Sequence, residues 1–282
     1  KQMQEENKTN NVNIKRLKIE GENFYCISNY NEMRPFFMSI VSDSHHWMFI
    51  SSNGALSAGR KNSEYSLFPY YTADKINESA ETTGSKSIFQ ILHNGEILVW
   101  EPFSERNVSL YATTRNLYKN TIGNKIIFEE INHDFNLTFR YEWNSSDIYG
   151  FVRKSSLENT GNNELTVTLL DGIQNIMPDG VSSDLQNSTS NLVDAYKRNE
   201  LDADSGLGIF ALSAIIVDKA EPSEALKSNI VWSLGLQNPN YLVSSLQLSK
   251  FRKKQKVVAE NDIKGEKGAY FLNSSIILKE NT

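Results

Sequence analysis

The sequence predicts an all-β protein, a large sandwich of antiparallel strands. Apolar side chains recur mainly with a period of two rather than 3.6 along the chain. The strand-like runs are short and fairly evenly spaced, and Asn or Gly residues separate most of them. Few segments have helical periodicity, so we expect only a few short helices.

The chain begins with a polar leader, which we expect to be a loose tail over residues 1–20. No internal linker is apparent, so residues 21–282 are predicted to form a single domain. Cys26 is the only cysteine and lies in a strand-like run, which predicts a buried, inert thiol. A start at Lys1 rather than Met is typical of a mature protein after signal removal or of a clipped segment. The first case predicts a periplasmic or secreted protein and the other a cytoplasmic one.

The first strong strand signals lie between Trp47 and Phe103. A strand over residues 48–50 leads to Asn53-Gly54 and a turn of small residues. The runs 88–92 and 96–100 flank Asn94-Gly95, the dipeptide favoured in two-residue type I′ turns. These runs therefore predict a β-hairpin.

Further strands and a few helices are expected downstream. Residues 125–131 and 137–143 predict an antiparallel pair, and the strand at 151–159 is followed by a return strand at 164–172. The remaining predicted strands cover 208–217, 228–236 and 269–272. The predicted helices cover 184–200, with Asp184 or Ser190 as N-cap, and one turn at 222–227. The basic cluster at 250–256 indicates a solvated loop or helix end.

Composition and motifs exclude several classes of function. The net charge of −5 gives no electrostatic reason to expect a nucleic-acid partner. No run of about 18 apolar residues is present, so no membrane span is predicted. The histidines are dispersed, and no phosphate-binding loop or paired-cysteine spacing occurs. We therefore expect neither a metal nor a cofactor.

Carboxylate pairs are the expected sign of glycoside cleavage, because an acid and a base or nucleophile must flank one bond. Glu129 and Glu130 are adjacent in a strand and face opposite sides, so they cannot form such a pair together. Asp171 follows a very apolar strand and precedes Gly172, where a turn-capping role and a role in a site are both consistent with the sequence. No catalytic residue is predicted.

The aromatic residues suggest a sugar-binding surface, because the C–H faces of sugar rings stack on Trp and Tyr. Hydroxyl groups then need Asn, Asp, Arg or Gln as partners. The alternative for each aromatic residue is a place in the sandwich core. The candidate sugar-binding residues are Trp47, Asn53, Arg60, Tyr70, Tyr71, Trp100, Trp143, Asp171 and Asn175, with Gln174 as a further polar candidate.

The order of several motifs resembles the N-terminal domain of cellobiose phosphorylase-like proteins, which are glycoside phosphorylases and hydrolases. The motifs are the small-residue turn at 50–59, the aromatic segment at 68–71, the Trp-x-Pro at 100–102 and the turn at 158–161. The likeness extends over about residues 35 to 275. It implies a galactose mutarotase-like β-supersandwich, the N-terminal part of a longer protein.

In that family the domain precedes an (α/α)6 barrel that carries the catalytic acid. The resemblance therefore implies a non-catalytic domain that supports this barrel and shapes the sugar site or a homodimer interface. A stand-alone aldose epimerase is the alternative, with His93 or His133 close to a carboxylate. A carbohydrate-binding module is a further alternative.

Overall fold

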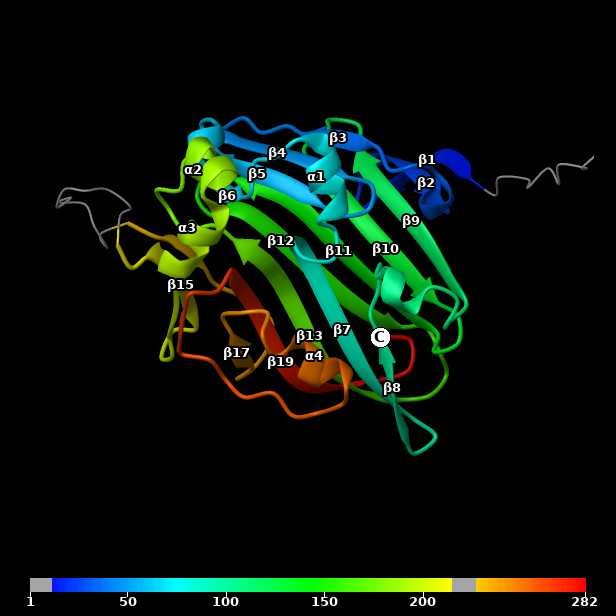
Figure 1. The fold of residues 1–282 in the computed structure, drawn as a ribbon. Coiled ribbons are helices and arrows are strands. Elements are labelled where there is room, and N and C mark those ends of the chain that lie inside the picture. The colour runs from blue at the N-terminus through cyan, green and yellow to red at the C-terminus, as the bar shows by residue number, and fades with distance from the viewer. Residues whose placement is uncertain (1–11, 215–226) are drawn as a thin grey trace, which may run out of the picture.

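The computed structural model describes residues 12–214 and 227–282 (Figure 1). Strands make up about half of this part of the chain, and they form several antiparallel sheets, which confirms the all-β class. The helices are short, as expected.

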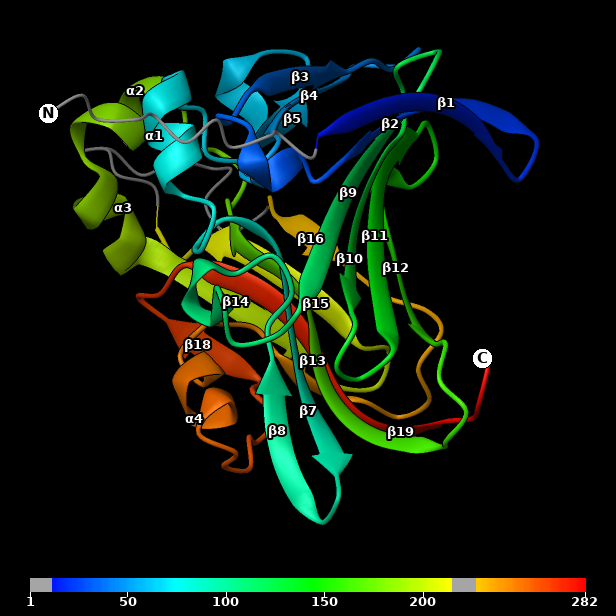
Figure 2. The same ribbon diagram turned by 90° about the vertical axis from the view of Figure 1, so that its right-hand side faces the viewer.

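Two large sheets face each other in Figures 1 and 2. The first sheet has the order β1 (Asn13–Ile19), β2 (Glu22–Ser28), β9 (Thr113–Asn120), β10 (Ile126–Asn132), β11 (Leu137–Ser146) and β12 (Gly150–Asn159). The second sheet has the order β17 (Asn240–Leu242), β19 (Gly268–Leu278), β13 (Leu165–Ile176), β7 (Gly84–His93) and β8 (Glu96–Trp100). The inner faces of both sheets contribute to the same core.

Two smaller sheets extend this sandwich. The third sheet has the order β3 (Phe37–Ile40), β4 (His46–Ser51), β5 (Leu56–Arg60) and β6 (Ser66–Phe68). The fourth has the order β16 (Asn229–Val231), β15 (Leu207–Leu212), β14 (Lys197–Asp202) and β18 (Asp262–Lys264). The helices are α1 (Ala73–Glu78), α2 (Ser183–Ser188), α3 (Ser190–Tyr196) and α4 (Leu248–Arg252), and the 3-10 turns are η1 (Tyr30–Glu32), η2 (Ser63–Tyr65) and η3 (Glu105–Asn107).

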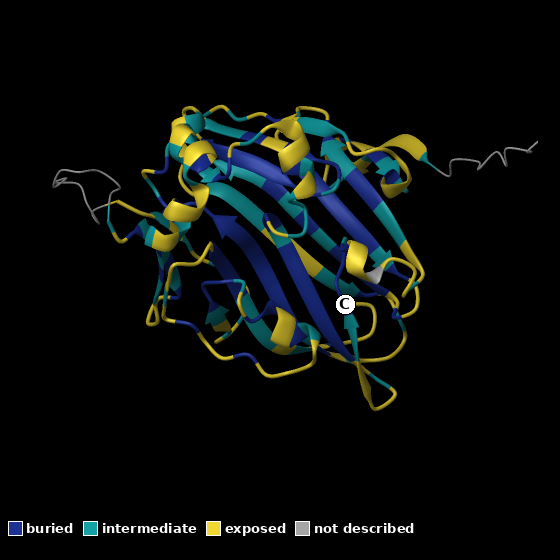
Figure 3. Cartoon of the chain, in the orientation of Figure 1, coloured by how far each residue is buried: buried dark blue, intermediate teal, exposed yellow. Residues whose placement is uncertain are grey.

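One buried cluster contains side chains from all four sheets, for example Phe128, Ile50, Phe89 and Phe210. The strands that cross the middle of the molecule are accordingly the most buried part of Figure 3, while the connecting loops are exposed. Since burial of apolar surface is the main force that holds sheets together, this shared core packs the four sheets against one another.

The second sheet is also buried on part of its outer face, the face turned away from β9–β12. There α4 and Val257 cover Ile88, Leu170 and Phe271. Figure 2 places α4 on the opposite side of β7 and β13 from the first sheet. Burial on both faces explains why β13 is apolar at successive positions rather than strictly alternating.

Several strand predictions are confirmed. Strands β7 and β8 pair around Asn94 and Gly95, whose φ angles of 51° and 82° are those of a type I′ turn. Strands β10 and β11 pair as expected, with Glu129 opposite Arg140. Cys26 is buried and free, as the strand pattern indicated.

Other predictions need correction. Residues 13–19, assigned to the tail, form β1, because each of them lies opposite a residue of β2 in an antiparallel ladder. The return strand at 164–172 does not pair with β12: β12 pairs with β11, while β13 crosses to the second sheet, between β7 and β19. Local alternation gave no information about which partner a strand chooses.

The helix predicted over 184–200 is shorter and broken. It begins one residue earlier, where the Ser182 hydroxyl accepts a hydrogen bond from the Leu185 amide at 3.2 Å, and it breaks at Thr189. Residues 197–202 form β14, since Lys197 and Asn199 alternate inward with their neighbours. The turn predicted at 222–227 and the end of the strand predicted at 208–217 lie largely outside the described residues.

Candidate functional site

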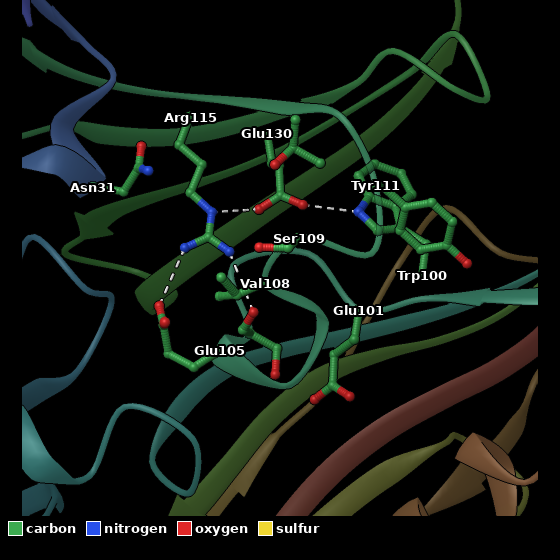
Figure 4. Close-up of a pocket in the computed structure, with 11 residues that line it drawn as sticks. Asn31, Trp100, Glu101, Glu105, Val108, Ser109, Tyr111, Arg115 and Glu130 are labelled. Carbon is green, nitrogen blue, oxygen red and sulfur yellow. Dashed lines mark hydrogen bonds and ion pairs between the residues drawn. The ribbon is translucent and has the colours of Figure 1, made fainter. Parts of the chain in front are cut away.

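A pocket of about 300 Å³ lies under the connection between β8 and β9, against the first sheet (Figure 4). Most of its lining comes from this connection, while Arg115 on β9 and Glu130 on β10 form its wall on the sheet. We call it the Arg115 pocket. Its lining residues are Asn31, Trp100, Glu101, Ser104, Glu105, Val108, Ser109, Tyr111, Thr113, Arg115 and Glu130.

Glu130 is fixed at the base of this pocket by three donors. Arg115, which lies opposite it in the β9–β10 ladder, donates from Nε at 2.7 Å. The Trp100 indole donates at 2.8 Å and the Phe103 amide at 2.7 Å. Burial disfavours the charge on Arg115, but the Glu130 carboxylate outweighs it and raises the pKa of Arg115.

Glu101 is held in a second network behind the pocket. Arg252, at the end of α4, binds both of its oxygens, at 2.7 and 2.8 Å. Lys86 lies 3.1 Å from Glu101 and 2.7 Å from Glu81. Burial alone would raise the pKa of Glu101, but the Arg252 hydrogen bond and the Lys86 charge outweigh it and lower this pKa.

These carboxylates are poorly suited to proton transfer. A general acid at neutral pH needs a raised pKa, whereas the pKa of Glu101 is lowered. Glu130 already accepts hydrogen bonds on both oxygens. The arrangement therefore favours binding of a polar group over acid–base catalysis.

Trp100 and Trp143 cannot contact a sugar, because they are 0% and 2% exposed and lie in the core between the sheets. Trp100 donates to Glu130, and the Trp143 ring packs edge-on against Phe68. Both were assigned to a sugar site from residue type alone. These two residues instead have the alternative position, in the sandwich core.

Asp171 is not a turn cap, and protein partners hold its carboxylate. It lies within β13 and points between the sheets, where Arg153 of β12 binds it at 2.9 and 2.7 Å. Ser155 donates to it at 2.7 Å. Burial alone would raise the pKa of Asp171, but the Arg153 charge and these hydrogen bonds outweigh it and lower this pKa.

The polar candidates have structural partners. Asn53 donates to the Asn77 carbonyl at 3.0 Å and accepts from the Ala55 amide at 3.1 Å, so it holds the turn after β4. Asn175 is buried, and its amide donates to Thr83 at 2.8 Å. Gln174 donates to the Glu81 carbonyl at 2.8 Å.

Two of the predicted aromatic residues do come together. The ring centroids of Trp47 and Tyr70 lie 5.6 Å apart, and Trp47 lies 6.0 Å from Phe49. Phe49 is 43% exposed and Tyr70 is 40% exposed. We call these three residues the Trp47 face. Gly59 makes it possible, because a Cβ there would lie 2.6 Å from the Trp47 ring.

Arg60 and Tyr71 lie outside this group. Arg60 is exposed at the end of β5, opposite His46 in the ladder. Tyr71 is partly buried, with the Lys75 ammonium 5.7 Å from its ring centre.

The sequence analysis missed Phe49, Arg115 and the role of Glu130. Phe49 has the same strand face as Trp47, since it is two residues away, and this spacing was a usable signal. No local signal pairs Arg115 with Glu130, because that contact depends on the register of β9 against β10.

The chain matches no protein-family model and no curated protein. Within residues 12–214 and 227–282, no group of three or more His, Cys, Asp or Glu side chains could hold a metal ion. In the same part of the chain, no helix is long and apolar enough to cross a membrane.

Proposed function

We propose that this chain is a non-catalytic, sugar-binding domain of a carbohydrate-active enzyme of the glycoside phosphorylase or hydrolase type. Its fold would be the galactose mutarotase-like supersandwich. Its partner would be an (α/α)6 catalytic barrel of the same parent protein. The Trp47 face is the observation that carries the proposal.

The rings of the Trp47 face lie at the surface, so packing in the core does not explain why they lie together. Trp47 and Phe49 project from the outer face of β4, and Tyr70 follows β6 in the same sheet region. Such rings match the C–H face of a sugar in both size and polarity. Backbone contacts fix them, since the Trp47 indole donates to the Asn62 carbonyl at 3.2 Å.

The ion pairs of three buried carboxylates support a non-catalytic role. Glu101, Glu130 and Asp171 each have an Arg partner within 2.7 Å. The pKa values of Glu101 and Asp171 are lowered, so these two groups are weak proton donors at neutral pH. The chemistry of the proposed parent protein would therefore lie in the barrel.

An epimerase on the same fold has less support. His93 packs edge-on against Phe135 with centroids 5.8 Å apart, and His133 lies 2.8 Å from the Thr114 hydroxyl. Among the described residues, neither histidine has a carboxylate oxygen within 4.0 Å of its ring nitrogens. The histidine–carboxylate pair expected for proton transfer at an anomeric carbon is not assembled.

Calorimetry with cello-, malto- and xylo-oligosaccharides tests the proposal. We expect one series to bind, and Trp47→Ala to weaken that binding about two- to twelvefold, because an aromatic contact contributes about 0.5–1.5 kcal/mol. Tyr25→Ala is the control, since Tyr25 is a surface aromatic residue on a different sheet. No binding by the unmodified chain, or equal losses in both variants, would refute the sugar site.

A mutarotation assay separates the two functions. We expect no acceleration of sugar anomerisation by the chain. Clear acceleration that is lost in His133→Ala or His93→Ala would instead establish the epimerase.

A further inference from the structure

A second hollow, of about 470 Å³, lies on the outer face of the second sheet beside α4. We propose that it binds an anionic polyol, that is, a sugar carrying a phosphate, sulfate or carboxylate group. We call it the Lys254 groove. Its lining residues are Gln90, Thr168, Asn238, Asn240, Phe251, Lys254, Gln255, Lys256, Val257, Asn273, Ser274 and Ser275.

The floor of the groove is a strip of polar residues on the outer face of the second sheet. Gln90, Thr168 and Ser275 lie opposite one another on β7, β13 and β19. The next row contains Asn273 with Asn240 beside it on β17. Neighbouring positions on the same face, such as Leu170, are buried under α4. Lys86 and Gln174 on the same face are also polar, but they are buried against Glu81, whereas the polar residues of the groove lie beside the helix.

The wall of the groove is the turn that ends α4. The Gln255 amide bonds the Lys250 carbonyl at 3.0 Å and the Lys254 amide bonds the Phe251 carbonyl at 2.9 Å, which is the Schellman pattern. Lys254 occupies the left-handed position of this motif, with φ at 62°. Glycine is the usual residue there, because a side chain strains this conformation. A lysine therefore occupies a strained backbone position beside the groove.

The charged residues that line the groove are all basic. Lys254 and Lys256 line the groove, and no carboxylate does. Neither lysine has a carboxylate within 4.0 Å in the described ranges. Two unpaired ammonium groups beside a polar floor favour an anion, although the whole chain has a net charge of −5.

The neutral lining indicates the rest of the ligand. The Gln90 amide donates to the Phe251 carbonyl at 2.8 Å and the Asn273 amide to the Leu169 carbonyl at 2.9 Å, which leaves their side-chain oxygens as acceptors. Asn238 and Asn240 can both donate and accept, which matches sugar hydroxyl groups. Phe251 and Val257 are each 2% exposed and only back the groove, so the ligand contacts would be polar. The combination fits a polyhydroxylated ring with one charged substituent better than it fits a bare anion.

The groove lies on a different sheet from the Trp47 face and shares no residue with it. The proposed anion site therefore goes beyond the proposed function, and it rests only on the residues that line the groove. Failure of the oligosaccharide experiment would leave it unaffected.

The test is calorimetry at low salt with four probes: glucose 6-phosphate, galacturonate, glucose and inorganic phosphate. We expect glucose 6-phosphate or galacturonate to bind at least about tenfold more tightly than either glucose or phosphate, because charge-assisted hydrogen bonds add to those of the hydroxyls. Equal affinity for glucose would overturn the anionic preference. Equal affinity for phosphate would overturn the polyol part.

Substitutions of lysines test whether the probe binds in the Lys254 groove. Lys254→Gln with Lys256→Gln should lower the affinity for the tightest probe at least about tenfold. Lys253→Gln is the matched control, since Lys253 precedes them in the same basic cluster and does not line the groove. Equal losses in both would overturn the assignment.

Lys254→Gly distinguishes binding from folding. Glycine relieves the left-handed strain, so this variant should melt about 2–4 °C higher while binding the probe more weakly. A variant that melts higher and keeps full affinity would show that Lys254 does not contact the ligand.

Discussion

At the scale of single residues, the molecule is organised by buried ion pairs between sheets. The Asp171 carboxylate on β13 meets the Arg153 guanidinium of β12, and Arg153 also donates to Ser85 at 3.0 Å. A charge inside a sandwich is costly unless its partner and its remaining hydrogen bonds are in place. This pair therefore specifies how β12 lies over β13.

Arg153→Met should leave Asp171 buried without its partner. We expect the free energy of unfolding to fall by about 3–5 kcal/mol, the usual cost of breaking a buried pair. Chemical denaturation monitored by tryptophan fluorescence measures it. The control is Arg198→Met, which removes an exposed Arg–Asp pair with Asp262 and should change stability little. Similar losses in the two variants would contradict the role of Arg153.

At the scale of elements, turns fix the register of the strands that surround the sites. The β7–β8 hairpin turns on Asn94 and Gly95, and its register places Trp100 opposite Phe89 in the core. It also directs the chain into the connection that lines the Arg115 pocket. A change in this turn thus affects both the core and the pocket.

Gly95→Ala should destabilise the protein by about 1–2 kcal/mol. A Cβ at Gly95 would meet no atom within 4 Å, so the cost is that of a left-handed backbone at φ 82° for an alanine. Thermal and chemical unfolding measure the loss. Glu96→Ala, the next residue along the chain, should have a smaller effect, and an equal effect would show that the turn conformation is not the cause.

At the scale of the whole molecule, acidic side chains are used as structural anions. Asp171, Glu101 and Glu81 all have lowered pKa values, since nearby Arg or Lys charges outweigh the effect of burial. Each ties together segments that are distant in sequence, as Glu101 on the segment after β8 does with Arg252 of α4. Ion pairs and apolar packing therefore stabilise contacts between the same segments.

Acid should therefore unfold the protein. A carboxylate with a lowered folded pKa stabilises the protein fully above its unfolded pKa, about 4, and this stabilisation is lost as pH falls through the folded pKa. We expect a flat free energy of unfolding between about pH 5 and 7 and a decline below about pH 4. Asp171→Asn should be less stable at pH 7 and show a shallower decline. An identical pH slope would contradict the contribution of Asp171.

The fold class and several local elements follow from the sequence. Period-two alternation identifies strands because successive side chains of a strand point to opposite faces. The Asn94-Gly95 hairpin and the pairing of β10 with β11 followed from turn chemistry and proximity along the chain. These features depend on neighbours within a few residues.

Only the tertiary structure decided which side chains meet. The aromatic residues show this: Trp47 and Tyr70 lie together on a surface, while Trp100 and Trp143, of the same chemical type, are in the core. Likewise, the strand of Asp171 crosses to another sheet and brings its carboxylate to Arg153. Alternation separates the two faces of a strand but does not say which face is buried or which strand lies across from it. The register and the packing of the sheets set those contacts.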